Sequence, residues 1–169
     1  MVSDDIQDAL NQQLNAEFFT AYNYLAMSAE FKSRNLTGFA HWSHVQSRLE
    51  LDHAMRIYGY INDRQGNVAL RQIEEPNVRW NSILEAFEIA YLHELKATTQ
   101  INRLVDMTFD QRDHATNNFL QWFVSEQVEE EALASEVVDS LKLVGETGNG
   151  LFLLDHDMAE RSIKVKTRT

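Results

Sequence analysis

Five residues of this chain have side chains that bind hard metal cations and also lie on the apolar faces of predicted helices. They are Glu17, Glu50, His53, Glu94 and Glu130. Glu50 and His53 are neighbours at i and i+3 on one helical face. Each of the other three glutamates falls at helical intervals from apolar residues before and after it. A carboxylate in an apolar interior is costly unless it is protonated or meets a cation.

Four carboxylates that converge at one level of a protein core cannot all stay charged without compensating cations. Two divalent cations would supply that charge, and a carboxylate that bridges them would hold them close enough for joint redox chemistry. The chain has no cysteine, so any metal must be bound through oxygen and imidazole nitrogen. The alternative is that some of these glutamates sit at the edge of a helix face and reach solvent.

Long helices must position these side chains. The pattern of apolar residues predicts four of them, at about 3–34, 38–64, 82–108 and 114–144, each roughly 40 Å long at about 1.5 Å per residue. Ser82 and Glu85 form a capping box that opens the third helix. Residues 66–81 have no helical period and include the only proline, Pro76. A connection of that length predicts a crossover from one end of a bundle to the other.

The fold class predicted is therefore all-α, a four-helix bundle in one domain that spans residues 1–169. The bundle takes up about residues 3–145. Glycines at 145, 148 and 150 separate it from a short fifth helix at about 150–162, and 163–169 is expected to be a mobile tail. That fifth helix is too short to join the bundle along its length and is expected to pack within an assembly.

The charge balance narrows the choice of partners. The chain has 26 acidic and 15 basic residues, a net charge of −11. This balance repels nucleic acid and anionic membranes and attracts cations. No segment has the roughly 20 apolar residues that a membrane span needs, and the first residues lack the pattern of a signal peptide. A cytoplasmic location is the expectation.

With these motifs in place, the sequence resembles ferritin along nearly its whole length. The motifs are Glu17, the segment Glu50-Leu51-Asp52-His53, Glu94, and the segment Gln127-Val128-Glu129-Glu130. In ferritin-like bundles two helices give one glutamate each and the others give Glu-x-x-His. The last motif here ends in glutamate, which resembles non-haem bacterial-type ferritins rather than bacterioferritins. The segment Gly148–Asp155 is similar to the start of the family's fifth helix.

The resemblance implies a role for each residue of the site. Glu17, Glu50 and His53 would bind one iron, and Glu50, Glu94 and Glu130 the other, with Glu50 as the bridge. Gln127 would support the site through a hydrogen bond. Tyr24 and Trp122 match aromatic residues that could supply electrons to oxygen, although Trp122 could equally be a core residue.

A third iron site of the family would map to Glu126, Glu129 and Glu130. The position before Glu50 is usually acidic in such ferritins, and here it is Leu49. This departure predicts a weakened or altered third site. Haem is not expected, because the methionine that binds it in bacterioferritins falls near Leu51, which cannot coordinate iron.

The function implied by the resemblance is iron storage with ferroxidase activity. Fe²⁺ would be oxidised by O₂ or hydrogen peroxide at two iron positions per subunit, and the Fe³⁺ mineral would be stored inside a hollow shell of 24 subunits. A non-catalytic shell that stores metal is the alternative. A rubrerythrin-like peroxidase is a third reading, but such proteins usually add a cysteine-ligated iron module.

Overall fold

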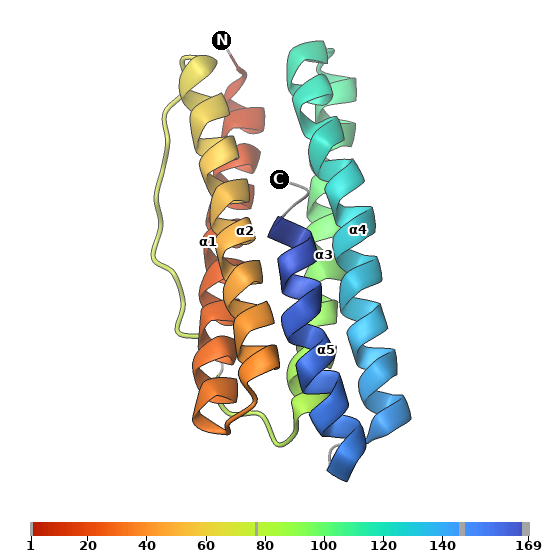
Figure 1. The fold of residues 1–169 in the computed structure, drawn as a ribbon. Helices are drawn as coiled ribbons and strands as arrows, with labels where there is room; N and C mark the ends of the chain where they lie inside the picture. Colours follow the sequence, from red (N-terminus) through yellow and green to blue (C-terminus); the bar gives the residue numbers. More distant parts are fainter. Residues whose placement is uncertain (1, 77, 146–147, 167–169) are drawn as a thin grey trace.

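The computed structural model describes residues 2–76, 78–145 and 148–166, with side chains as far as Arg161. Within these residues the chain forms five α-helices and no strand. They are α1 (Asp4–Ser33), α2 (Thr37–Asp63), α3 (Ile83–Asp110), α4 (His114–Val144) and α5 (Gly148–Lys166). The first four form an elongated bundle in which α1 packs mainly on α2 and α3 on α4 (Figure 1). The all-α bundle predicted from the sequence is confirmed.

Local signals explain where three of the long helices begin. The side-chain oxygens of Ser3, Ser82 and Asp113 accept hydrogen bonds from backbone N–H groups of Ile6, Glu85 and Thr116. Such caps satisfy N–H groups that have no partner inside the helix. The second helix is different, because Leu36 stands at its N-cap and has no side chain that can do this.

The long crossover between α2 and α3 carries the chain from one end of the bundle to the other (Figure 1). Its first half is bound to α1 by Gln7, Asn11 and Asn15, which recur every four residues along one helix face. Asn11 donates to the carbonyl of residue 67 and accepts from the N–H of Ala69, at 2.9 and 2.7 Å. These bonds pair backbone groups that an extended segment would otherwise leave to water.

Two apolar cores fill the ends of the bundle and leave a polar layer between them. One core, near the start of α2 and α3, is built around Phe31, Phe39 and Phe87. The other, near the end of α2 and the start of α4, contains Ile57 and Leu120. Each fully buried side chain of this size contributes about 1.5–3 kcal/mol. The two cores therefore fix the four helices on either side of the polar layer.

The fifth helix is longer than expected and packs differently. It begins at Gly148 and continues to Lys166, so part of the segment predicted to be a mobile tail is helical, and residues 167–169 lie outside the described part. It folds back along α2 and α4 (Figure 1). Leu154 and Met158 are buried in the core of its own subunit. These contacts within its own subunit were not expected from the sequence, and the expected packing within an assembly stays a prediction.

Asp155 explains why α5 docks on the start of α2. Its carboxylate accepts hydrogen bonds from the backbone N–H groups of Gly38 and Phe39, both at 2.9 Å. A Cβ atom at position 38 would collide with the backbone of Asp155. Glycine therefore permits the close approach, and α5 supplies the cap that α2 lacks in its own sequence.

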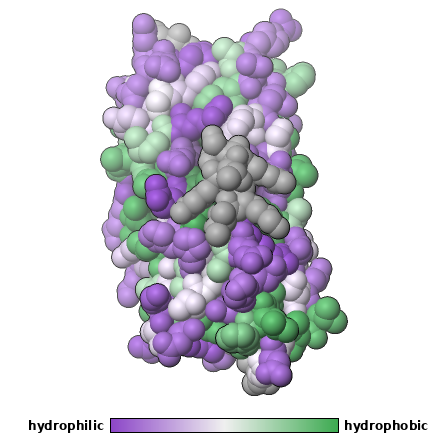
Figure 2. All heavy atoms as spheres, viewed as in Figure 1, coloured by the Kyte–Doolittle hydropathy of each residue, from purple (hydrophilic) through white to green (hydrophobic). Residues whose placement is uncertain are grey.

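The molecular surface is mostly polar on the face that carries α5, and apolar residues gather over its lower end (Figure 2). The exposed apolar side chains include Leu143 at the end of α4 and Phe152 and Leu153 near the start of α5. In the part of the chain that is described, no helix is both long and apolar enough to cross a membrane.

Candidate metal centre

The polar layer between the two cores contains the five residues singled out by the sequence. Glu17 lies near the middle of α1, Glu50 and His53 near the middle of α2, Glu94 in α3 and Glu130 in α4. All five are 2–5% exposed. Because each stands near the midpoint of its helix, packing the helices side by side brings them to one level. None of these glutamates reaches solvent, so the edge-of-helix alternative does not hold.

Glu17, Glu50 and His53 form the tightest group. The Nδ1 atom of His53 lies 3.3 Å from Oε2 of Glu50 and 3.9 Å from Oε2 of Glu17. One ligand atom from each of the three lies within 4.8 Å of the others, a spacing that could hold one metal ion. This is the set of residues expected to bind the first iron.

Glu94 is oriented by two neighbours. The Tyr24 hydroxyl donates a hydrogen bond of 2.9 Å to its carboxylate. The side-chain amide of Gln127 donates to the backbone carbonyl oxygen of Glu94 and to Thr98 Oγ1, both at 3.2 Å. The structure thus brings Tyr24 and Gln127 to the site. Both were expected there from the resemblance.

Burial and mutual repulsion dominate the electrostatics of the site. Burial raises the pKa of Glu94 to about 7 and that of Glu130 to about 8. The pKa of Glu50 lies well above its ordinary range, because of burial and then of repulsion from Glu94, Glu17 and Glu130. Burial lowers the pKa of His53, so its imidazole is neutral near pH 7 and free to bind a cation. A bound cation would favour the ionised form of these carboxylates and offset the repulsion between them.

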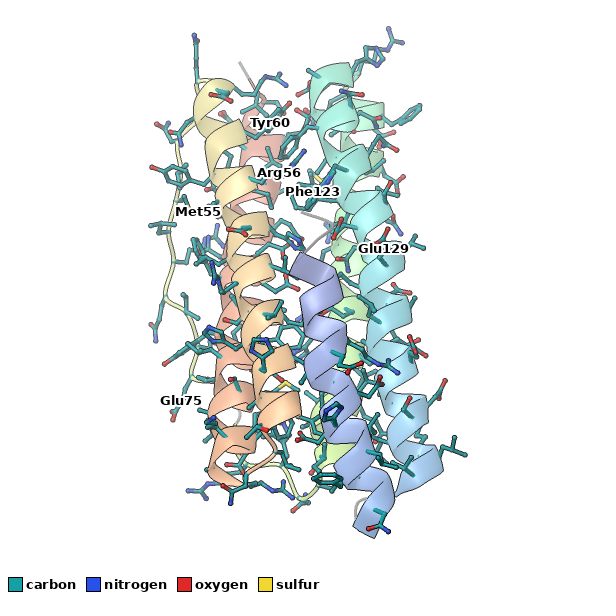
Figure 3. The ribbon with its side chains drawn as sticks, viewed as in Figure 1. Met55, Arg56, Tyr60, Glu75, Phe123 and Glu129 are labelled. Carbon is teal, nitrogen blue, oxygen red and sulfur yellow. The ribbon has the colours of Figure 1, made fainter. Side chains whose placement is uncertain are left out.

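A second group of possible ligands consists of His53, Glu126 and Glu130. It differs from the expected second iron set, because Glu94 belongs to neither group and Glu126 is included. Glu126 is half-buried, whereas Glu129 is exposed and outside the group (Figure 3). Of the three residues expected to form a third iron site, the structure thus groups only Glu126 and Glu130. Leu49, where an acidic residue was expected, is half-buried.

Two supporting residues escaped the sequence reasoning. Buried Gln13 donates a hydrogen bond of 2.7 Å to Oε1 of Glu17, and buried Gln46 donates one of 3.1 Å to Oε2 of Glu130. Each stands four residues before a glutamate of the site on the same helix face. That spacing of a polar residue within an apolar face was the available signal.

Aromatic residues close the site toward the end of α2. The Trp122 ring meets the His53 ring edge-on, with centroids 5.3 Å apart. The Arg56 guanidinium lies 4.1 Å above the same indole, and Arg56, Tyr60 and Phe123 are seen between α2 and α4 (Figure 3). Trp122 therefore contacts a possible ligand directly and also packs against the apolar core, and its expected part in supplying electrons stays a prediction.

Chemically, the arrangement offers hard oxygen ligands, one neutral imidazole and a nearby phenol. Such a ligand set suits iron or manganese more than soft metals. Carboxylates from all four helices of the bundle face one buried volume. The structure therefore contains a site fit for divalent cations that has the means to stabilise a higher charge.

Known proteins agree with this architecture. The family model described as Ferritin-like domain matches residues 7–144. A bacterial non-heme ferritin of Campylobacter jejuni is 41% identical over 92% of this chain and 93% of its own. A probable bacterial non-heme ferritin-like protein of Haemophilus influenzae is 38% identical over 98% and 100%. A solved open pore ferritin of Archaeoglobus fulgidus superimposes with a TM-score of 0.92 at 45% identity, covering 94% of this chain and 98% of that one.

Proposed function

The chain belongs to the ferritin family, and from this premise we propose that it is an iron-storage subunit with ferroxidase activity. The observation that carries the proposal is the buried layer of Glu17, Glu50, His53, Glu94 and Glu130. Iron is the substrate of this site. Two Fe²⁺ per chain would bind there, the first to Glu17, Glu50 and His53 and the second to Glu50, Glu94 and Glu130.

In the reaction each of two Fe²⁺ ions gives up one electron. Dioxygen takes both electrons and two protons and becomes hydrogen peroxide. If hydrogen peroxide is the oxidant instead, its O–O bond breaks and two more protons complete two water molecules. Carboxylate oxygens favour the ferric product, because a higher positive charge gains more from anionic ligands. Tyr24 donates a hydrogen bond to Glu94 and would hold that carboxylate in position while iron is oxidised.

Storage requires an enclosed volume, and we propose a homo-oligomeric shell of 24 subunits. Exposed apolar side chains support assembly where they gather on one helix face, as Leu51, Met55 and Tyr58 do at i, i+4 and i+7 on α2. Eight of the fourteen large ones lie on α1, α2 and the crossover: Tyr22, Leu25, Leu51, Met55, Tyr58, Leu70, Ile73 and Val78. The cytoplasmic location expected from the sequence remains a prediction.

The test is to load the assembled protein with Fe²⁺ in air and follow both oxidation and core formation. Ferroxidase with storage predicts oxidation faster than in buffer, and electron-dense cores inside hollow particles. A Glu50→Gln variant, which loses the bridging carboxylate, should assemble but oxidise iron at the buffer rate. Cores in the parent without rapid oxidation would support the non-catalytic storage shell instead.

A further inference from the structure

A small cavity lies between α1 and α3, on the face of the bundle away from α5. Its floor is buried and formed by Tyr24, Met27, Ala86 and Ala90. Its rim consists of half-buried side chains, among them Ile89. The cavity therefore leads from the protein surface to the tyrosine that donates a hydrogen bond to Glu94.

The size of the cavity restricts what it can hold. The cavity has a volume of about 20 Å³. A single water molecule needs roughly 10–15 Å³ by the same measure. A guest of two heavy atoms fits this space, and an organic ligand does not.

The lining disfavours water. It is mostly apolar, and its buried polar groups are largely engaged. The Asn23 amide donates to the Phe19 carbonyl, and the Tyr24 hydroxyl donates to Glu94. The polar atoms of the lining therefore present almost nothing to the cavity. A buried water is held by two to four polar partners, and this lining does not offer them.

The cavity offers no carboxylate ligand to iron cations. None of the nine lining residues is acidic. The half-buried carboxylate of Glu126 stands on α4 instead, grouped with His53 and Glu130. Cations and an uncharged oxidant would therefore approach the site from different sides of the bundle.

We propose that the cavity between α1 and α3 binds dioxygen and delivers it to the metal centre past Tyr24. Dioxygen is diatomic and apolar, so it matches the volume and the apolar lining of the cavity. The delivery step rests on the ferroxidase function proposed above, whereas the binding of a small apolar gas does not.

The binding step is tested with xenon, an apolar probe of similar size. Crystals of the full-length assembled protein are placed under xenon pressure. Xenon density is expected beside Tyr24 in the parent and absent in Ile89→Trp, which enlarges a half-buried side chain at the rim. Val105→Trp is the matched control, since Val105 is also half-buried on α3 but does not line the cavity. Parent crystals without xenon in the cavity would overturn the proposal.

The delivery step is tested by the dependence of iron oxidation on dioxygen concentration at saturating Fe²⁺. Ile89→Trp should raise the half-saturating dioxygen concentration several-fold and leave anaerobic Fe²⁺ binding unchanged, and Val105→Trp should behave as the parent. If the parent oxidises iron rapidly and Ile89→Trp shows the same dioxygen dependence, the delivery route is wrong and the ferroxidase function stands. If the parent has no rapid oxidation, the ferroxidase function itself fails, and with it any oxidant role of the cavity, whatever xenon shows.

Discussion

At the residue scale, the chemistry of this protein depends on carboxylates placed where water is scarce. Glu50 is the centre of the arrangement, because it contacts His53 and is repelled by Glu94, Glu17 and Glu130. These side chains could be predicted from sequence, since a glutamate in an apolar stripe is conspicuous. Gln13 and Gln46 could not be singled out as readily, because a buried amide becomes meaningful only once its carboxylate partner on the same or another helix is known.

Replacing Glu94 by alanine should remove one predicted ligand and the acceptor of the Tyr24 hydrogen bond. We expect intact particles and a loss of at least about tenfold in the rate of rapid Fe²⁺ oxidation. Glu88→Ala is the control, because the Glu88 side chain on α3 is 46% exposed and pairs with Lys142 at the surface. Stopped-flow absorbance measures the rate and light scattering the assembly. A Glu94→Ala variant as fast as the parent would remove Glu94 from the site.

Cation binding should depend on pH in the direction set by the raised pKa values. Glu94 and Glu130, with pKa values of about 7 and about 8, are largely protonated at pH 6.5 and ionised at pH 9. Because a cation must displace those protons, the affinity of the site for the cation should rise with pH. The number of protons released on binding should fall from about one or two per chain at pH 6.5 toward none at pH 9.

This pH dependence is measured by calorimetry with Zn²⁺, which has no redox chemistry, in buffers of different ionisation enthalpy. The same shifts predict that the protein without added metal loses stability as the pH rises from about 4.5, the ordinary glutamate value, toward 8, because the folded state binds more protons in that range. Affinity for Zn²⁺ that stays constant over pH 6.5–9 would contradict the assignment.

At the element scale, the lengths of the helices were predictable and the docking of the last one was not. All four long helices begin and end within two residues of the predicted positions. Capping side chains mark the starts of α1, α3 and α4, and Gly145 marks the end of α4. The place of α5 depends on Asp155 meeting the start of α2, more than a hundred residues earlier in the chain. No local pattern encodes a contact of that range.

Asp155→Ala should loosen both α5 and the first turn of α2. Loss of an N-cap costs about 0.5–2 kcal/mol, which corresponds to roughly 2- to 30-fold faster hydrogen exchange at the amides of Gly38 and Phe39. Asp155→Asn keeps a side-chain oxygen that can accept and should recover most of the protection. Amide exchange read by mass spectrometry compares the three proteins. Equal protection in Asp155→Ala would show that packing of Leu154 and Met158 alone holds α5.

At the scale of the whole molecule, the bundle exposes large apolar side chains that take no part in its own core. Met55 and Tyr58 are 47% and 39% exposed on α2, and Met55 lies on the side away from α4 (Figure 3). Leu25 recurs at helical spacing with Leu14 and Ala21, which are buried, yet Leu25 is 44% exposed. Periodicity cannot separate an apolar face that turns inward from one that meets another subunit, because both faces have the same spacing.

A charge in this apolar region should impair assembly without unfolding the subunit. We expect Tyr58→Glu to shift the protein from large particles to small species, because a buried unpaired carboxylate at an interface costs several kcal/mol. Asn62→Glu, one turn along α2 at an exposed polar position, is the control. Analytical ultracentrifugation measures size, and circular dichroism measures helix content. Full-size particles for Tyr58→Glu would place the assembly contacts elsewhere.

The proposed function requires that one bundle oxidises two irons within its own core. Stopped-flow absorbance, recorded after the iron-free protein is mixed with aerobic Fe²⁺ in increasing amounts per subunit, is the first measurement to make. We expect a fast phase whose amplitude saturates at about two irons per chain, the number that the carboxylates of four helices with a Glu-x-x-His pair can hold. Saturation near three would add a site at Glu126. Oxidation no faster than in buffer alone would contradict the ferroxidase function and leave a shell that only stores metal.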